Sequence, residues 1–178
     1  MFLKFRFLLL SLLIVNIYSC KSTAALAEIE SMRKTVLDKN FTIVANSASP
    51  VAFANVRGIE KLLPPGSNLA NISLINIQNN FTIKNDSVFL DMPFYGERRF
   101  ANGYGTETGL QFKGKPDRVK TSFNAKKNKY LLEYWLNAKT ESLRISLTLF
   151  ANKTCRFTVN SSHRSTITYD GNWESLKN

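Results

Sequence analysis

The stretch YLLEYWLNAKTESLRISLTLF, residues 130–150, decides the fold of this chain. Its apolar residues recur at every second position, which is the period of a β-strand with one covered face. They are Tyr130, Leu132, Tyr134 and Leu136, followed by Leu143, Ile145, Leu147 and Leu149. Polar residues connect the two halves. The stretch therefore predicts two strands of an antiparallel sheet.

The alternation continues outward on both sides of this stretch. We expect a preceding strand that ends at a hairpin tip, Lys126-Lys127-Asn128-Lys129, and a last short strand that ends before Asp170-Gly171. Outside the stretch, the strand patterns begin at Phe41, Val88, Val119, Cys155 and Ile167, and one more runs from Ile72 into Ile77 and resumes at Phe81 after a bend. Seven or eight strands joined mostly by hairpins make a mainly β chain. We predict an antiparallel meander closing as a barrel or a two-sheet sandwich.

One helix is expected before the strands. Its apolar residues are spaced by three or four positions, which is helical periodicity. They are Leu26, Ile29, Met32 and Val36. The pattern ends near Asp38-Lys39-Asn40, where the period of two begins. The apolar stripe is narrow and lacks aromatic residues, so packing against the domain is favoured over lying in a membrane surface.

The interior of the sheet is predicted to be filled. Its inward candidates are large, as Phe123, Leu132, Leu147 and Phe157 illustrate, whereas a ligand cavity needs small residues facing inward. Trp135 lies on the less apolar face of its strand. It fits either a core position or the wall of a pocket, and we expect the core.

The N-terminus has the form of a bacterial lipoprotein signal. Lys4 and Arg6 precede an apolar run, residues 7–17, which is too short for a transmembrane helix of roughly 20 residues. The run closes at Ser19-Cys20, and we expect cleavage between them and lipidation of Cys20. A plain secretory signal cut near Ser19 or Ala24, or an uncleaved anchor, are the alternatives.

These features divide the chain and place it in the cell. We predict a signal peptide (1–19), a lipidated tether (20–25), a single helix-plus-β domain (26–174) and a tail (175–178). The mature chain keeps 22 of the 24 basic residues against 13 acidic ones, a charge near +9. The basic residues are scattered, and no nucleic-acid-binding motif accompanies them. A solvated basic surface is favoured over a site for anionic lipid or glycan.

The sequence offers no organised catalytic group. Cys155 alternates with Phe157 and Val159, which predicts a buried thiol, and the one histidine, His163, lies in a polar turn. The carboxylates show no paired spacing. We therefore expect a protein that is not an enzyme and has no metal or cofactor.

A segment rich in glycine and aromatic residues interrupts the strands. It runs from Met92 through Tyr104 to Phe112. It lacks the spacing of a phosphate-binding loop. It is expected to be either an ordered structural loop or a lid over a pocket mouth. The candidate lid residues are Pro93, Phe94, Tyr95, Gly96, Gly103, Tyr104, Gly105 and Gly109.

The same segment carries a family resemblance. Met92-Pro93-Phe94-Tyr95-Gly96, Tyr104-Gly105 and Gly109-Leu110-Gln111-Phe112 resemble blocks of small Bacteroidota lipoproteins, the domain-of-unknown-function family 4251. The resemblance covers roughly residues 24–174. It implies a lipocalin-like antiparallel barrel in the cell envelope, and it supplies no catalytic residues. Met92, where leucine is usual, and the charged Glu97-Arg98-Arg99 depart from the pattern.

Asp86-Ser87-Val88 resembles the acceptor of Bacteroidota O-glycosylation, so Ser87 is a candidate glycan site at a hairpin tip. For the whole chain we expect a non-catalytic structural or interaction module of the cell envelope. The alternative is a binding protein for a small apolar or amphipathic ligand. We expect the protein to contact the membrane through the lipid on Cys20. Its other partner is expected to be an envelope protein or the small ligand. The outer membrane is favoured over the inner one, with a weak preference for the periplasmic face.

Overall fold

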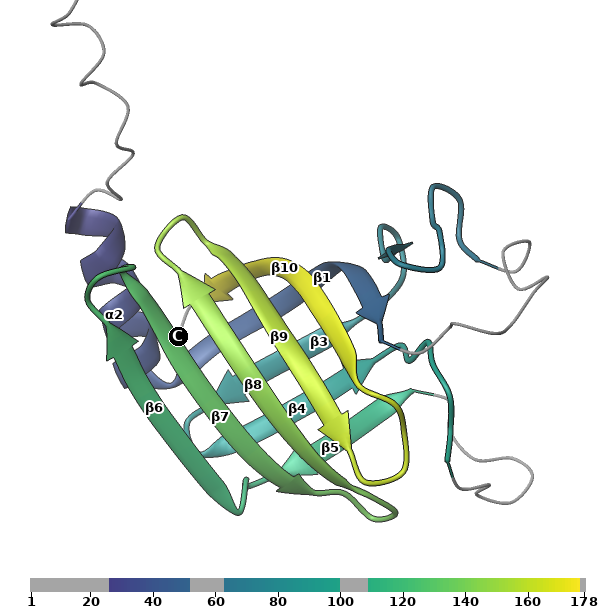
Figure 1. Ribbon diagram of the computed structural model, residues 1–178. Coiled ribbons are helices and arrows are strands. Elements are labelled where there is room, and N and C mark those ends of the chain that lie inside the picture. The colour runs from purple at the N-terminus through teal and green to yellow at the C-terminus, as the bar shows by residue number, and fades with distance from the viewer. Residues whose placement is uncertain (1–25, 52–62, 100–108, 177–178) are drawn as a thin grey trace, which may run out of the picture.

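The computed structural model describes residues 26–51, 63–99 and 109–176. They form one helix and one antiparallel sheet (Figure 1). The elements are α2 (Leu26–Asp38), β1 (Asn40–Pro50), β2 (Ile72–Ser73), β3 (Asn80–Lys84), β4 (Ser87–Met92), β5 (Leu110–Gly114), β6 (Arg118–Asn124), β7 (Lys129–Asn137), β8 (Ser142–Phe150), β9 (Thr154–Ser161) and β10 (Ile167–Ser175).

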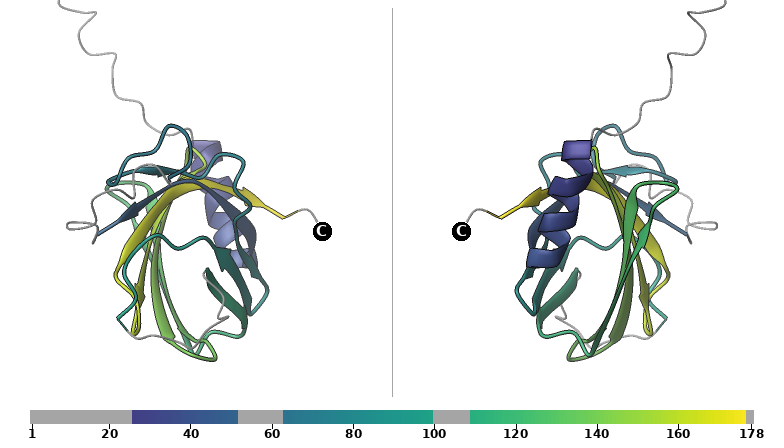
Figure 2. Two further views of the ribbon diagram at one scale, coloured as in Figure 1. Left: turned by 90° about the vertical axis from the view of Figure 1, so that its right-hand side faces the viewer. Right: turned by 90° about the vertical axis from the view of Figure 1, so that its left-hand side faces the viewer.

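The sheet consists of two meanders, β3–β5 and β6–β9. The first and last long strands, β1 and β10, pair with each other in the middle and join the two. Its order is β5-β4-β3-β1-β10-β9-β8-β7-β6, with β2 added beside β1. All of these pairs are antiparallel. The sheet curls so that β6–β9 face β3–β5 across the interior, as Figure 2 shows from the side. The result is a half-barrel, which confirms the predicted mainly β, antiparallel architecture with an N-terminal helix.

The covered face of the sheet is filled by large side chains. Phe81 and Phe157 lie with ring centroids 5.2 Å apart, and Phe157 stacks on Tyr169 at 4.8 Å. Trp173 is fully buried beside them in the same core, and its Nε1–H donates to the Phe150 carbonyl at 2.9 Å. The prediction of large inward-facing residues is therefore correct for Leu132, Leu147 and Phe157.

The helix packs as its periodicity predicts at Met32 and Val36, but Leu26, which was predicted on the same apolar stripe, is exposed. Met32 and Val36 are buried in the core, and Thr35 is buried with its hydroxyl donating to the Ser31 carbonyl at 2.9 Å. Leu37 is exposed as well. None of the helices in the described ranges is long and apolar enough to cross a bilayer.

Three strand predictions were wrong. The described sheet has ten strands rather than seven or eight, and the expected strand from Ile72 to Ile77 covers only Ile72–Ser73. The last strand does not stop before Asp170-Gly171 but continues to Ser175. It continues because β1 pairs with it along its whole length, a contact between chain ends that local turn residues do not report.

Two aromatic residues are less buried than predicted. Trp135 is half-buried on the outer face, between the guanidinium groups of Arg118 and Arg144 at 4.9 and 5.3 Å from its ring. Phe123 shares the inner face with Tyr130, as predicted, yet 43% of it is exposed. It stays exposed because β6 is the last strand of the described sheet, and no neighbouring strand covers that part of the face.

Candidate functional site

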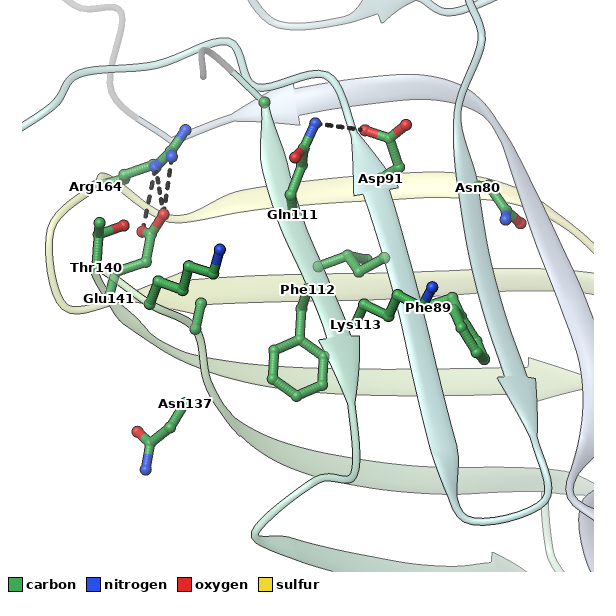
Figure 3. A pocket seen from close by; sticks show the side chains of 14 residues that line it. Asn80, Phe89, Asp91, Gln111, Phe112, Lys113, Asn137, Thr140, Glu141 and Arg164 are labelled. Carbon is green, nitrogen blue, oxygen red and sulfur yellow. Dashed lines mark hydrogen bonds and ion pairs between the residues drawn. The ribbon is translucent and has the colours of Figure 1, made fainter. Parts of the chain in front are cut away.

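A hollow among the described residues lies at the mouth of the half-barrel beside β5 (Figure 3). Its volume is about 700 Å³. The wall on one side comes from β4 and β5, and on the other from the β7–β8 connection and Arg164. We call it the mouth cavity. Its lining includes Phe89, Leu90, Asp91, Gln111, Phe112, Lys113, Asn137, Lys139, Thr140, Glu141 and Arg164.

The strand alternation explains the mixed character of this wall. Gln111 and Phe112 project from opposite faces of β5 (Figure 3). Phe112 pairs across the sheet with the buried Leu90, so it belongs to the inner face. Gln111 Nε2–H donates to Asp91 Oδ1 at 3.3 Å on the outer face. The cavity therefore presents apolar surface inward and polar groups at its rim.

A buried ion pair closes the far side of the mouth cavity. Arg164 Nη2 lies 2.8 Å from Glu141 Oε1, and both side chains are only 5–6% exposed. Arg164 Nε also donates to this carboxylate, at 2.9 and 3.1 Å, and the Ser161 hydroxyl donates to it as well. The two charges neutralise each other, and the pair joins the β7–β8 connection to the β9–β10 connection.

The predicted lid segment reaches the same corner. The Phe94 ring covers the Arg164 guanidinium at 5.1 Å, and the Tyr169 hydroxyl donates to the Pro93 carbonyl at 2.7 Å. Burial raises the pKa of the Tyr95 phenol. The segment is therefore held by contacts with Arg164 in the β9–β10 connection and with Tyr169 in β10.

Hydrogen bonds from the β9–β10 connection hold the continuation of this segment. Ser165 N–H donates to the Glu97 carbonyl at 2.9 Å, and Glu97 N–H donates to Ser165 Oγ at 3.1 Å. A Cβ on Gly96 would lie 2.6 Å from Ser165 Oγ, so the close approach requires glycine here. In the described residues 93–97 these contacts are those of an ordered loop. A lid function is not needed to explain them.

Gly109, the last candidate lid residue, lines the mouth cavity and a second hollow of about 430 Å³ beneath Pro93, Phe94 and Tyr95. Gly103, Tyr104 and Gly105 lie outside the described residues, as do Ser19 and Cys20. The structure therefore places five of the predicted lid residues, 93–96 and Gly109, near the mouth cavity. The sequence analysis had selected all five. It missed Glu141 and Arg164, because their pairing joins residues 23 positions apart.

Ser87 follows the two-residue turn between β3 and β4, as predicted. Asn85 in this turn has φ 55° and its N–H donates to the Lys39 carbonyl at 2.8 Å. Asp86 is exposed and lies 2.9 Å from Lys39 Nζ, and this contact lowers the pKa of the Asp86 carboxyl. Ser87 itself is half-buried.

The two side chains considered for nucleophilic chemistry are separated. Cys155 is buried near the start of β9, whereas His163 follows the end of that strand, where its Nδ1 lies 2.7 Å from the Ser162 hydroxyl. Burial, aided by the charge of Asp170, raises the pKa of Cys155 to about 12. A thiol with such a pKa is a poor nucleophile near neutral pH. The described residues hold no cluster that could bind a metal ion.

The edge strand β6 is a second candidate surface. All residues of β6 before Asn124 are exposed. Val119 and Phe123 lie on its inner face and are 47% and 43% exposed. Arg118 and Lys120 lie on its outer face. An edge with free backbone groups and apolar side chains can accept a further strand.

Comparison with known proteins gives a consistent picture. The chain is similar to a crystal structure of a DUF4251 family protein from Bacteroides eggerthii DSM 20697, with a TM-score of 0.57 and 15% sequence identity. The similarity covers 84% of this chain and 88% of that one, and at this identity it shows the fold alone. No curated protein matches. The sequence model of the family "domain of unknown function (DUF4251)" matches residues 24–173. The chain therefore belongs to the DUF4251 family.

Proposed function

We propose that this protein is a non-catalytic interaction module of the cell envelope, anchored by lipid on Cys20, which binds another envelope protein through β6. The exposed edge of β6 carries the proposal. Its inner face offers Val119 and Phe123, and its outer face offers Arg118 and Lys120. A partner strand with apolar residues on one face and acidic residues on the other would match both.

The rest of the described structure supports binding over catalysis. Aromatic and aliphatic side chains form one continuous core, so room for a small molecule is found in the hollows at its edge. Each fully buried side-chain nitrogen or oxygen of the described residues has a hydrogen-bond partner. The buried charges Glu141 and Arg164 satisfy each other. Such groups stabilise a fold, and they leave none poised for proton transfer.

Site-specific photo-crosslinking in the native host tests the binding surface. A photo-reactive phenylalanine replaces Thr121, in the middle of β6, and in a control chain it replaces Val44, which is 51% exposed but lies on the central strand β1. We expect a covalent adduct with one envelope protein from position 121 and none from position 44. If position 121 gives no adduct, or both positions give the same ones, the edge is not the binding surface.

The lipid anchor is tested separately. Labelled palmitate should enter the wild-type chain and not a Cys20→Ala variant, and the variant should leave the membrane fraction in a high-salt wash. Retention of Cys20→Ala in membranes, with no label in the wild type, would contradict the anchor. The crosslinking result would still report on the β6 edge.

A second candidate function rests on the mouth cavity. Its apolar wall at Leu90 and Phe112 and its rim charges at Lys113 and Lys139 suit an amphipathic molecule with an acidic group. The volume of about 700 Å³ lies within the range of small-molecule sites. Native mass spectrometry of protein purified from its own host should then show a bound small molecule, and a Phe112→Ala chain should lose it. A mass equal to that of the bare chain would count against this function.

A further inference from the structure

Four lysines gather at the end of the molecule where the helix begins. Lys126 and Lys127 lie in the β6–β7 turn, Lys129 opens β7, and Lys153 lies in the β8–β9 turn. Lys129 pairs across the sheet with Phe150, so the two turns are neighbours. Figures 1 and 2 place both turns at the same end as the N-terminal end of α2. We call these four residues the lysine end.

The charges of the lysine end are not neutralised within the described residues. The ion pairs found there join Lys39 to Asp86, Arg144 to Glu133, Arg156 to Asp170 and Arg164 to Glu141. None includes a residue of the lysine end, and the two turns, residues 125–128 and 151–153, contain no acidic residue. The helix beside them carries nearly balanced charge. A local positive potential therefore remains.

The fold holds these lysines in place. The Lys153 ammonium lies 3.7 Å from the centre of the Trp173 ring, and Lys129 lies 5.8 Å from the Phe150 ring. Asn128 and Lys153 adopt positive φ angles of 46° and 68°, and Lys127 N–H donates to Asn124 Oδ1 at 3.1 Å. Ordered turns keep their lysines close together, so binding through them costs less conformational entropy than binding through a free tail would.

The short segment before α2 limits how far the lysine end can lie from the membrane that holds the lipid. Only residues 21–25 separate Cys20 from Leu26, the first residue of the helix, so six residue steps join the two. Six residues span at most about 20 Å when extended. Under the proposed function, the bilayer holding the lipid is therefore close to this end. Electrostatic attraction acts over about 8 Å at physiological salt, so lysines here can reach the headgroups.

We propose that the lysine end docks on the anionic phospholipid headgroups of the membrane that holds the Cys20 lipid. The lipid supplies attachment, and the lysines orient the sheet so that β6 and the mouth cavity stand at fixed positions relative to the bilayer. Each lysine near an anionic surface strengthens binding about fivefold. Together with a lipid chain, such a patch makes the second signal that stable anchoring needs.

Vesicle sedimentation tests the docking without the lipid. The mature chain, residues 20–178 with Cys20→Ser, is mixed with vesicles of equimolar phosphatidylcholine and phosphatidylglycerol, or of phosphatidylcholine alone. We expect binding to the first vesicles only, and its loss in high salt. A Lys126→Gln, Lys127→Gln, Lys153→Gln variant should bind about 100-fold more weakly, the product of three fivefold steps.

The matched control removes the same charge elsewhere. Lys84→Gln, Arg99→Gln, Lys115→Gln changes three exposed basic residues that belong neither to the lysine end, nor to β6, nor to the mouth cavity. It should bind within a few-fold of the unsubstituted chain, and both variants should keep the same circular dichroism spectrum. Equal weakening by both variants would show that net charge alone acts, and overturn the docking.

Absence of binding to the phosphatidylglycerol vesicles would also overturn it. This outcome is distinct from failure of the anchor. If palmitate labels Cys20 but the vesicles do not bind, the docking is wrong and the anchor stands. If vesicles bind as expected but no palmitate enters, the lysine end recognises anionic lipid without the attachment that the proposed function assumes.

Discussion

Gly171 decides how closely the two central strands can approach. It pairs with Ala45 where the β1–β10 register shifts, and a Cβ at this position would lie 2.2 Å from the Val44 carbonyl oxygen and 2.7 Å from Ala45 Cα. Both neighbours are backbone atoms, which cannot rotate away. The missing side chain is thus what allows the strands to pair at this point.

We expect Gly171→Ala to destabilise the protein by about 3 kcal/mol, because overpacking against backbone forces the strands apart. Urea unfolding measures this change. The neighbouring exposed Asn172→Ala is the control and should stay within about 0.5 kcal/mol of the wild type, as surface substitutions do. Equal stability of Gly171→Ala and the wild type would contradict the close approach.

The thiol of Cys155 makes stability depend on pH. Burial raises its pKa from 9.0 to about 12, so the folded state prefers the protonated thiol. The contribution to stability is complete below pH 9, the pKa of the unfolded chain, and is lost as the pH rises toward 12. Between these values the slope is about 1.4 kcal/mol per pH unit.

Urea unfolding in reducing buffer should therefore show a steeper loss of stability above pH 9 for the protein with Cys155 than for Cys155→Ala. The comparison between the two chains removes the effect of other titrating groups, such as buried Tyr134, whose pKa burial also raises. Parallel stability curves for the two chains would show that the thiol ionises as freely in the folded state as in the unfolded one.

At the scale of elements, the Glu141–Arg164 pair joins the β7–β8 connection to the β9–β10 connection. Both side chains are almost fully buried, so removing one charge leaves the other without compensation. Three hydrogen bonds from Arg164 and Ser161 converge on one carboxylate. The pair is therefore a point at which two hairpins depend on each other.

We expect Glu141→Gln to cost about 3–5 kcal/mol of stability, because the Arg164 charge stays buried and unpaired. The double variant Glu141→Leu, Arg164→Met should recover much of this loss, since it removes both charges and keeps side-chain volume. Chemical unfolding of the three chains checks the order. A single variant as stable as the wild type would mean that water or another group already serves Arg164.

Local periodicity was a good guide to individual elements. α2 and the strands β7 and β8 were predicted from spacing alone, because each repeats its period over several turns or pleats. Periodicity assigns residues to a face but does not say how far that face is covered. For this reason Phe123 was placed on the correct face and yet expected to be buried, and Trp135 was expected in the core.

For the whole molecule, closure of the sheet depends on its last strand. Phe41, Ile43 and Ala45 pair with residues 171–175, more than 120 positions further along the chain. Trp173 brings a fully buried indole to this pairing. Without these residues, β1 would lose the neighbour that joins the two halves of the sheet.

We expect a chain ending at Asp170 to remain unfolded. Loss of one buried tryptophan alone costs about 3–5 kcal/mol, and small proteins have only about 5–15 kcal/mol in total. Circular dichroism and limited proteolysis check this, with a chain ending at Leu176 as the folded control. A cooperative thermal transition in the chain ending at Asp170 would show that the two halves of the sheet are stable without their central pairing.

The sequence was enough to predict α2, strands such as β7 and β8, and the large residues on their inner face, because periods of two and of three to four residues are visible within short windows. It also supplied the family, through the blocks at Met92-Pro93-Phe94-Tyr95-Gly96 and Gly109-Leu110-Gln111-Phe112. Only the tertiary structure decided that β1 pairs with β10, that Arg164 meets Glu141, and that β6 is left at an edge. Each of these joins or separates residues distant along the chain, and local spacing carries no information about such contacts.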